Sequence, residues 1–255
     1  VSGELPSHPE LLDWLAVEFR ESGWDVKKLF KLIVLSNTYR QAATQTPEKR
    51  EQDPENRLFS RGPRFRMDAE MVRDHALAAS GLLVEKLGGP SVKPYQPDGV
   101  WEAIAMNVSN TRAYQRDDGE SLYRRSMYWF WKRMAPPASM DIFNAPNREF
   151  CVVRRERTNT PLQALVTLND VQFVEAARWL AQRTLQSGGP LDETRVQFMS
   201  ERVLSRPLRA EELQIALGSL RDLRGWYQQN QEAARELPAF GVSPADPSLP
   251  AAELA

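Results

Sequence analysis

Apolar side chains recur every three or four positions along most of the chain, which is the spacing of one face of an α-helix. Residues that commonly cap helices precede these runs, among them Ser7, Asp25, Asp68 and Thr160. Ser7 and Thr160 are each followed three positions later by Glu or Gln, as in a capping box. The pattern predicts helices, caps included, over about 7–23, 25–39, 68–83, 100–106, 121–133, 160–169, 170–186, 192–204 and 209–229.

Several stretches have no clear period. Residues 42–56 are polar and predict a loop with one turn after Pro54, and residues 107–119 look irregular. Residues 138–159 predict a long non-helical insertion with an extended strand near 150–153. Residues 238–255 carry four prolines and predict a truncated tail or linker, either disordered or strapped across the surface. The sequence therefore predicts an all-α fold, with a single helical domain over 1–237 followed by this Pro-rich tail.

The composition narrows the class of protein. Hydrophobic residues make up 42% and charged residues 26% of the 255 residues, as in ordinary soluble globular proteins. No apolar run approaches the roughly 20 residues of a membrane span. The net charge of −1 argues against nucleic acid as a partner. One cysteine and two histidines exclude an internal disulfide, a thiolate zinc cluster and a histidine-rich metal centre, so we expect no cofactor.

The densest group of charges is basic. Between Arg124 and Arg157 there are eight Lys or Arg residues against three Asp or Glu, a balance of +5. Arg154, Arg155 and Arg157 directly precede the helix predicted after Thr160, whose N-terminal amides favour anions. Guanidinium groups can bind a carboxylate, sulfate or phosphate through two parallel hydrogen bonds. These arginines therefore predict either an anion site or internal ion pairs that hold the irregular segment in place.

Aromatic residues gather in the same region, at Tyr123 and at the consecutive positions 128–131. One helix face cannot bury four consecutive rings, so at least one ring is expected to meet solvent, a partner or another domain. Two interpretations stay open: a core helix, or a surface whose rings stack on sugars beside arginines that suit acidic sugars. The candidate ligand-binding residues are Tyr123, Arg124, Arg154, Arg155, Arg157 and Asn159.

The residues usually found in catalytic centres form no recognisable set. Carboxylates are numerous, but no pair is distinguished by its surroundings. His75 lies one residue after Asp74 and five after Glu70, spacings that do not align three side chains on one helix face. Cys151 has no histidine nearby in the sequence and is flanked by apolar residues. Whether the chain is an enzyme therefore stays open at this stage.

Three stretches together resemble a known family. They are Ser121–Pro137, Ala145–Glu149 and Val153–Leu165, the last containing the run Arg-Thr-Asn-Thr-Pro-Leu-Gln. The chain resembles the domain of unknown function fifteen-fifty-three over about residues 7–213. One departure is Val171, where the family pattern leads us to expect proline after Asp170; this changes a helix start and not the chemistry.

The resemblance implies a setting, although it implies no established reaction. Such domains lie toward the C-terminus of planctomycete-type surface or secreted proteins, typically after a cytochrome-c-like domain and a second domain of unknown function. We therefore expect an extracytoplasmic helical module of a multidomain protein. It would bind an acidic polysaccharide, or the upstream domains of its own polypeptide, through an arginine-rich and aromatic surface. The alternative is part of a polysaccharide-degrading enzyme whose site is completed by those upstream domains.

Overall fold

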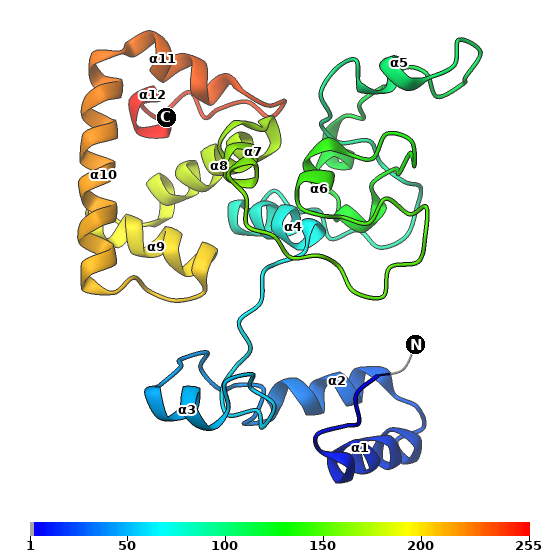
Figure 1. Cartoon of the computed structure of the whole chain (residues 1–255). Helices are drawn as coiled ribbons and strands as arrows, with labels where there is room; N and C mark the ends of the chain where they lie inside the picture. Colours follow the sequence, from blue (N-terminus) through cyan, green and yellow to red (C-terminus); the bar gives the residue numbers. More distant parts are fainter. Residues whose placement is uncertain (1–2) are drawn as a thin grey trace. The chain divides into compact units, whose positions relative to one another are not determined.

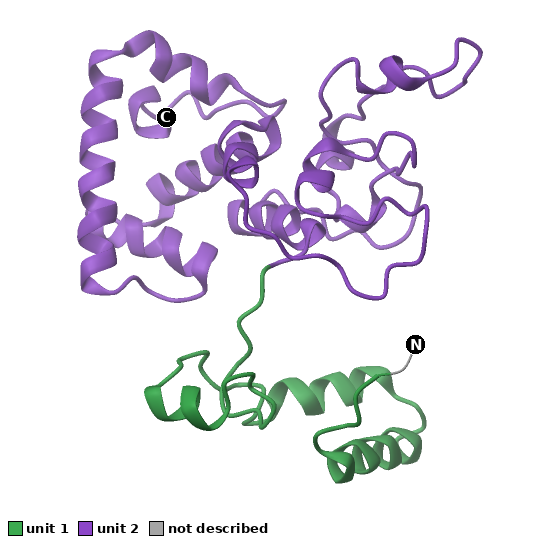
Figure 2. Ribbon diagram, in the orientation of Figure 1, with its two compact units in different colours: residues 1–66 green, residues 67–255 purple. Residues whose placement is uncertain are grey.

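The computed structural model describes residues 3–255, and it is built from helices joined by long irregular segments (Figure 1). The all-α prediction is confirmed, since the described residues contain three isolated β-bridges but no β-strand. Contacts between Cα atoms divide the chain into two compact units, 1–66 and 67–255 (Figure 2). This boundary falls inside the range 1–237, for which the sequence predicts one domain. Among the residues described, no helix is both long enough and apolar enough to cross a membrane.

The described part of unit 1, which spans residues 1–66, contains three helices: α1 (Pro9–Glu21), α2 (Val26–Leu35) and α3 (Pro47–Gln52). The predicted cap of the second helix is confirmed, because the Asp25 carboxylate accepts a hydrogen bond of 3.0 Å from the Lys28 amide. The predicted capping box at Ser7 is wrong. Proline at the first position of α1 makes His8 the N-cap, and the Ser7 hydroxyl lies 3.0 Å from the His8 ring.

The segment 42–56, which the sequence predicts to be a loop, contains helix α3. Thr46 provides the start: its hydroxyl accepts a hydrogen bond of 3.3 Å from the Lys49 amide. Pro47 then occupies the first helical position, where a missing amide costs nothing. A cap and a proline are therefore sufficient to begin a short helix in a segment without an apolar stripe.

Unit 2, residues 67–255, holds the other helices. The helix α4 packs against α8 and α9, α7 packs against α8, and α9 packs against α10. The elements of this unit are α4 (Ala69–Ser80), α5 (Val100–Ile104), α6 (Ala138–Ile142), α7 (Pro161–Asn169), α8 (Val171–Ser187), α9 (Asp192–Leu204), α10 (Ala210–Gln229), α11 (Gln231–Glu236) and α12 (Ala251–Leu254), with three 3-10 turns, η1 (Gly119–Tyr123), η2 (Ser126–Tyr128) and η3 (Leu237–Ala239).

The predicted break between α7 and α8 is confirmed. Asp170 ends α7 and caps α8, and its carboxylate accepts a hydrogen bond of 3.0 Å from the Gln172 amide. The capping box at the start of α7 is also present, with the Gln163 side chain accepting from the Thr160 amide at 3.4 Å. The helix α4 is shorter than predicted, because Gly81 adopts a left-handed conformation and ends it at Ser80.

The helix predicted over 121–133 is wrong. This stretch consists of η1, η2 and an extended run whose backbone pairs with Val92: the Val92 amide donates to the Tyr128 carbonyl and the Phe130 amide to the Val92 carbonyl. The extended run buries Trp129 and leaves its two neighbours half-exposed, an arrangement that a helix could not give four consecutive rings. The segment 138–159, predicted to be non-helical, begins with the helix α6. The strand predicted near 150–153 is also absent, since no neighbouring segment pairs with it.

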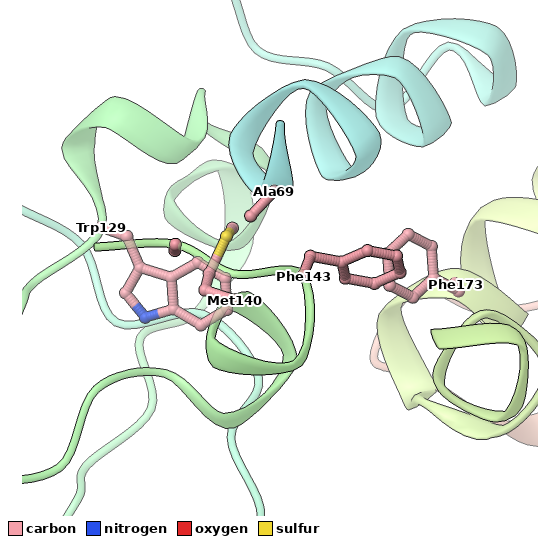
Figure 3. Packing of buried hydrophobic residues seen from close by; sticks show 6 residues of the cluster. Ala69, Trp129, Met140, Phe143 and Phe173 are labelled. Carbon is pink, nitrogen blue, oxygen red and sulfur yellow. The ribbon is translucent and has the colours of Figure 1, made fainter. Parts of the chain in front are cut away.

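The hydrophobic core of unit 2 is small (Figure 3). It contains Ala69 at the start of α4, Trp129 of the extended run and Phe173 of α8. Met140 lies in α6, and Phe143 directly follows that helix. The rings of Phe143 and Phe173 lie 6.4 Å apart between centroids. The irregular segments are therefore held by these few contacts together with polar ones.

The C-terminal residues 238–255, for which the sequence leaves both disorder and a surface strap open, lie against the rest of unit 2. Pro238 and Leu254 are buried there, and residues 251–254 form the short helix α12. Residues around Ser243 cross α8, where they meet the polar side chains of that helix.

Candidate functional site

The arginines predicted to bind an anion have different surroundings. Arg155 forms a two-pronged ion pair with Glu70 of α4, with Nη1–Oε2 and Nη2–Oε1 distances of 2.5 and 3.1 Å. Burial raises the pKa of Glu70, but the hydrogen bonds from Arg155 and from the backbone, together with the charges of Arg155 and Arg148, outweigh burial and hold that pKa below its usual value. Arg154, Arg157 and Asn159 are exposed. Arg155 is thus an internal ion-pair partner, which was one of the two interpretations of this segment.

Arg124 is buried and serves the backbone. Its terminal nitrogens donate to the carbonyls of Lys86 at 3.1 Å, Pro90 at 2.9 Å and Gly88. Its guanidinium also lies 3.9 Å from the ring centroid of Tyr128. Because these contacts bury the side chain to 4% exposure, Arg124 fixes the loop 86–90 and faces no ligand from solvent.

Tyr123 leads to a buried carboxylate on α8. Its hydroxyl donates to Oε1 of Glu175 at 3.0 Å, and the hydroxyl of Tyr95 donates to Oε2 at 3.0 Å. Glu175 Oε1 also accepts from the Ser243 amide at 2.8 Å and from its hydroxyl at 2.6 Å. Arg178 lies 3.8 Å away and donates to the Ser243 carbonyl and hydroxyl. These hydrogen bonds hold the C-terminal segment around Ser243 against α8. Burial together with the Glu175 charge raises the pKa of Tyr95.

A polar pocket of about 550 Å³ opens beside this network. It contains one guanidinium group, two carboxyl groups, two side-chain amides and one exposed aromatic ring, that of Phe240. Three separate parts of unit 2 and a single arginine meet there, namely 95–98, Arg116, 169–171 and 239–241.

The polar groups of the pocket differ in whether they already form ion pairs or hydrogen bonds with other residues. The Arg116 guanidinium lies 5.3 Å from the ring centroid of Tyr95 and has no ion-pair partner among the described residues. The side-chain nitrogen of Gln96 is buried and has no acceptor in the described part of the chain. Asn169 uses its nitrogen to reach the Leu165 carbonyl at 2.8 Å, which leaves its oxygen as an acceptor. Burial raises the pKa of Asp170, although hydrogen bonds from Gln172 oppose the shift.

Sequence reasoning identified two residues of this pocket, as a helix break and not as a site, and missed the others. It identified the helix break at Asn169–Asp170, which places both side chains at the pocket wall. Nothing in the spacing of Arg116 or Phe240 indicates a site, because each is a single residue in a segment without a motif. None of the six predicted ligand-binding residues lines this pocket.

Comparison with known proteins gives a family and no function. No curated protein and no solved structure matches the chain. The model of the family described as "PSD1: Protein of unknown function (DUF1553)" matches residues 1–220. That range covers most of the chain and includes the core, α8 and most of the pocket. The chain therefore belongs to the PSD1 (DUF1553) family.

Proposed function

We propose that this chain is an extracytoplasmic binding module of a multidomain protein, and that it binds an acidic saccharide in the polar pocket of unit 2. The observation that carries the proposal is that one pocket contains both the guanidinium of Arg116, which has no ion-pair partner among the described residues, and the exposed ring of Phe240. The extracytoplasmic and multidomain setting comes from the resemblance of the sequence to its family.

The chemistry of the pocket wall suits an acidic sugar. Arg116 can hold a carboxylate or sulfate group with two parallel hydrogen bonds. Phe240, which is 50% exposed, offers a ring face to the apolar face of a sugar. The size of the pocket, about 550 Å³, falls in the range of small-molecule sites, which combine an apolar surface with a few placed polar groups.

The amides and carboxyls supply contacts for hydroxyl groups. A buried donor without an acceptor is costly, so the Gln96 nitrogen gains from a ligand oxygen at this position. The Asn169 oxygen and the carboxyl of Asp98 can accept from hydroxyls. This distribution favours a hydroxyl-rich ligand whose single acidic group lies at Arg116.

The arginine of the proposed site is not one of those that the sequence predicts. Arg155 is paired with Glu70 and Arg124 is bound to carbonyls, so neither guanidinium is free for a ligand. Arg116 has no such partner among the described residues, and it lies against an aromatic side chain. The arginine and aromatic chemistry is retained, and it is assigned to other residues.

Cleavage of a saccharide is a second candidate function, and one observation favours it. Burial raises the pKa of Asp170, a shift that lets a carboxyl group act as a general acid. Asp98 lies in the wall of the same pocket and would be the second carboxylate of such a pair. Release of reducing ends from a bound oligosaccharide, lost in Asp170→Asn, would distinguish cleavage from binding alone.

Binding can be tested by calorimetry and thermal shift with oligogalacturonide, a sulfated oligosaccharide and a neutral oligosaccharide of equal length. We expect the acidic ligands to bind, to raise the melting temperature, and to lose affinity at high salt. Arg116→Ala should weaken binding ~10-fold or more, as expected for loss of a charged hydrogen bond. Arg112→Ala, a nearby exposed arginine outside the pocket, is the matched control. Equal affinity of the two variants, or no binding to any saccharide, would refute the proposal.

A further inference from the structure

The first two helices of unit 1 leave most of their large apolar side chains exposed. Neither α1 nor α2 contains a buried residue, although both are rich in large apolar side chains. Trp14 is 52% exposed and Phe30 is 61% exposed. Contiguous apolar surface of this kind marks an interaction site in a stable protein, because leaving it in water is unfavourable.

On α1 the uncovered apolar side chains lie among acidic ones. Glu10, Asp13, Trp14 and Val17 are spaced at i, i+3, i+4 and i+7, and therefore share one face of the helix. All four side chains are exposed, and neither carboxylate forms an ion pair in the described part of the chain. This face, which we call the acidic face, presents an apolar stripe with two unpaired negative charges.

On α2 the uncovered apolar side chains lie among basic ones. Val26, Phe30 and Val34 follow one another every four residues along one line of the helix. Lys27 and Lys31 form the adjacent line, and neither has an ion-pair partner within the described residues. A third lysine, on another side of the helix, is already paired with Glu18 of α1. This second face, the basic face, thus complements the acidic face in charge and resembles it in apolar content.

We propose that a second copy of this chain covers these helices, with the acidic face of each copy packed on the basic face of the other. A two-fold interface requires a surface that is complementary to itself, so that each contact occurs twice. Two oppositely charged apolar faces, on helices that contact each other, supply the two halves of such a surface. A single unlike partner would not need both. In this dimer Glu10 and Asp13 of one copy face Lys27 and Lys31 of the other, around the rings of Trp14 and Phe30.

The experiment measures the mass of the full chain in solution by sedimentation velocity over a wide concentration range. We expect a dimer that Lys27→Glu/Lys31→Glu converts to monomer, raising the dissociation constant ~10-fold or more, since like charges then face one another. Adding Glu10→Lys/Asp13→Lys to that variant restores opposite charges and should restore the dimer. Arg40→Glu/Arg64→Glu changes the same number of charges at exposed positions of unit 1 outside both helices, and should leave the dimer intact.

The four substituted positions on the helices are exposed, so circular dichroism should show unchanged helix content in every variant. A chain that stays monomeric at all concentrations would overturn the proposal and would leave these faces to an unlike partner. A dimer that survives Lys27→Glu/Lys31→Glu would overturn it as well. Restoration by the combined four-residue variant is the result that only a self-complementary interface produces.

Discussion

Unit 1 and unit 2 differ in which energetically unfavourable placements of side chains they contain, either charged groups in the interior or large apolar groups exposed to water. In unit 2, charged side chains lie inside: Arg73 is 2% exposed and Glu175 is 1% exposed. In unit 1, large apolar side chains of the helices lie outside, none of its three helices contains a buried residue, and two charged side chains that follow α3, Asp53 and Arg61, are buried. Unit 2 has few apolar core residues for its length, and its buried charges satisfy the backbone of long irregular segments.

The difference indicates which positions should be sensitive to substitution. In unit 2 a single guanidinium or carboxylate holds several carbonyls, amides or hydroxyls, so its removal leaves several buried groups without partners. In unit 1 the hydrogen bonds that define the helices are local, such as the caps at Asp25 and Thr46. Stability should therefore depend on a few polar side chains in unit 2, whereas the helices of unit 1, outside the buried pair Asp53 and Arg61, should tolerate change at their surface in the monomer.

Arg73→Met tests this difference most severely. Arg73 donates to the carbonyls of Leu122 at 2.6 Å and Arg124 at 2.8 Å, and to the Gln172 side chain at 2.7 Å. Burial lowers its pKa to about 10, so the group is still charged at neutral pH. Methionine fills similar volume but leaves these acceptors unpaired, and we expect a loss of ~3–5 kcal/mol in the free energy of unfolding.

Urea unfolding monitored by tryptophan fluorescence measures this loss. Arg133→Met, at an exposed position, serves as the control and should change the free energy of unfolding by less than ~0.5 kcal/mol. If Arg73→Met cost no more than the control, the irregular segments of unit 2 would not depend on this guanidinium.

Gly241→Ala tests the packing of the C-terminal segment around Ser243 against α8, and it has the second largest expected effect. A Cβ atom at Gly241 would lie 2.5 Å from the carboxyl carbon of Glu175, and the backbone φ of +94° disfavours any L side chain. We expect a loss of ~2–3 kcal/mol in the free energy of unfolding, measured by thermal and urea unfolding. Gly218→Ala is the matched control, because nothing lies within 4 Å of its Cβ in α10. It should instead stabilise the chain by ~0.5–1 kcal/mol. Equal effects of the two substitutions would contradict the close packing of Gly241 against Glu175.

Much of the fold can be predicted from the sequence because helix starts depend on nearby residues. The side chains of Asp25 and Asp170 each accept a hydrogen bond from an amide two or three positions later, and the Thr160 amide donates to the side chain of Gln163. All three predicted helix starts are confirmed. The prediction fails over 121–133, where the backbone is decided by a partner about 35 residues earlier, Val92, and by burial of Trp129. Tertiary contacts override helical spacing there, and the sequence alone contains no record of them.

The candidate site is harder to predict for the same reason. Its wall is assembled from segments near Tyr95, Arg116, Asp170 and Phe240, which are far apart in the chain and share no motif. The arginines that do form a conspicuous run meet other requirements, as when Arg155 pairs with Glu70. A run of like charges shows where charge is concentrated, but which charges are already paired is known only from the fold.

Arg155→Ala carries the smallest expected effect and tests that pairing directly. Arg155 and Glu70 are 32% and 27% exposed, so solvent screening limits the pair, and we expect a loss of ~1 kcal/mol at neutral pH. Arg155 holds the pKa of Glu70 below its ordinary value of 4.5 in the folded chain. The ion pair therefore contributes fully above pH 4.5, and its contribution is lost as pH falls through the lowered folded pKa.

The free energy of unfolding should accordingly differ between parent and Arg155→Ala at neutral pH, and the difference should shrink as the pH falls below 4.5. Arg154→Ala removes the adjacent exposed arginine and should follow the parent at every pH. A constant difference between Arg155→Ala and the parent would mean that packing of the arginine stem, and not its charge, stabilises the segment. The ion pair would then be no obstacle to an anion, and the arginine-rich segment would again compete with Arg116 as the acidic ligand's binding site.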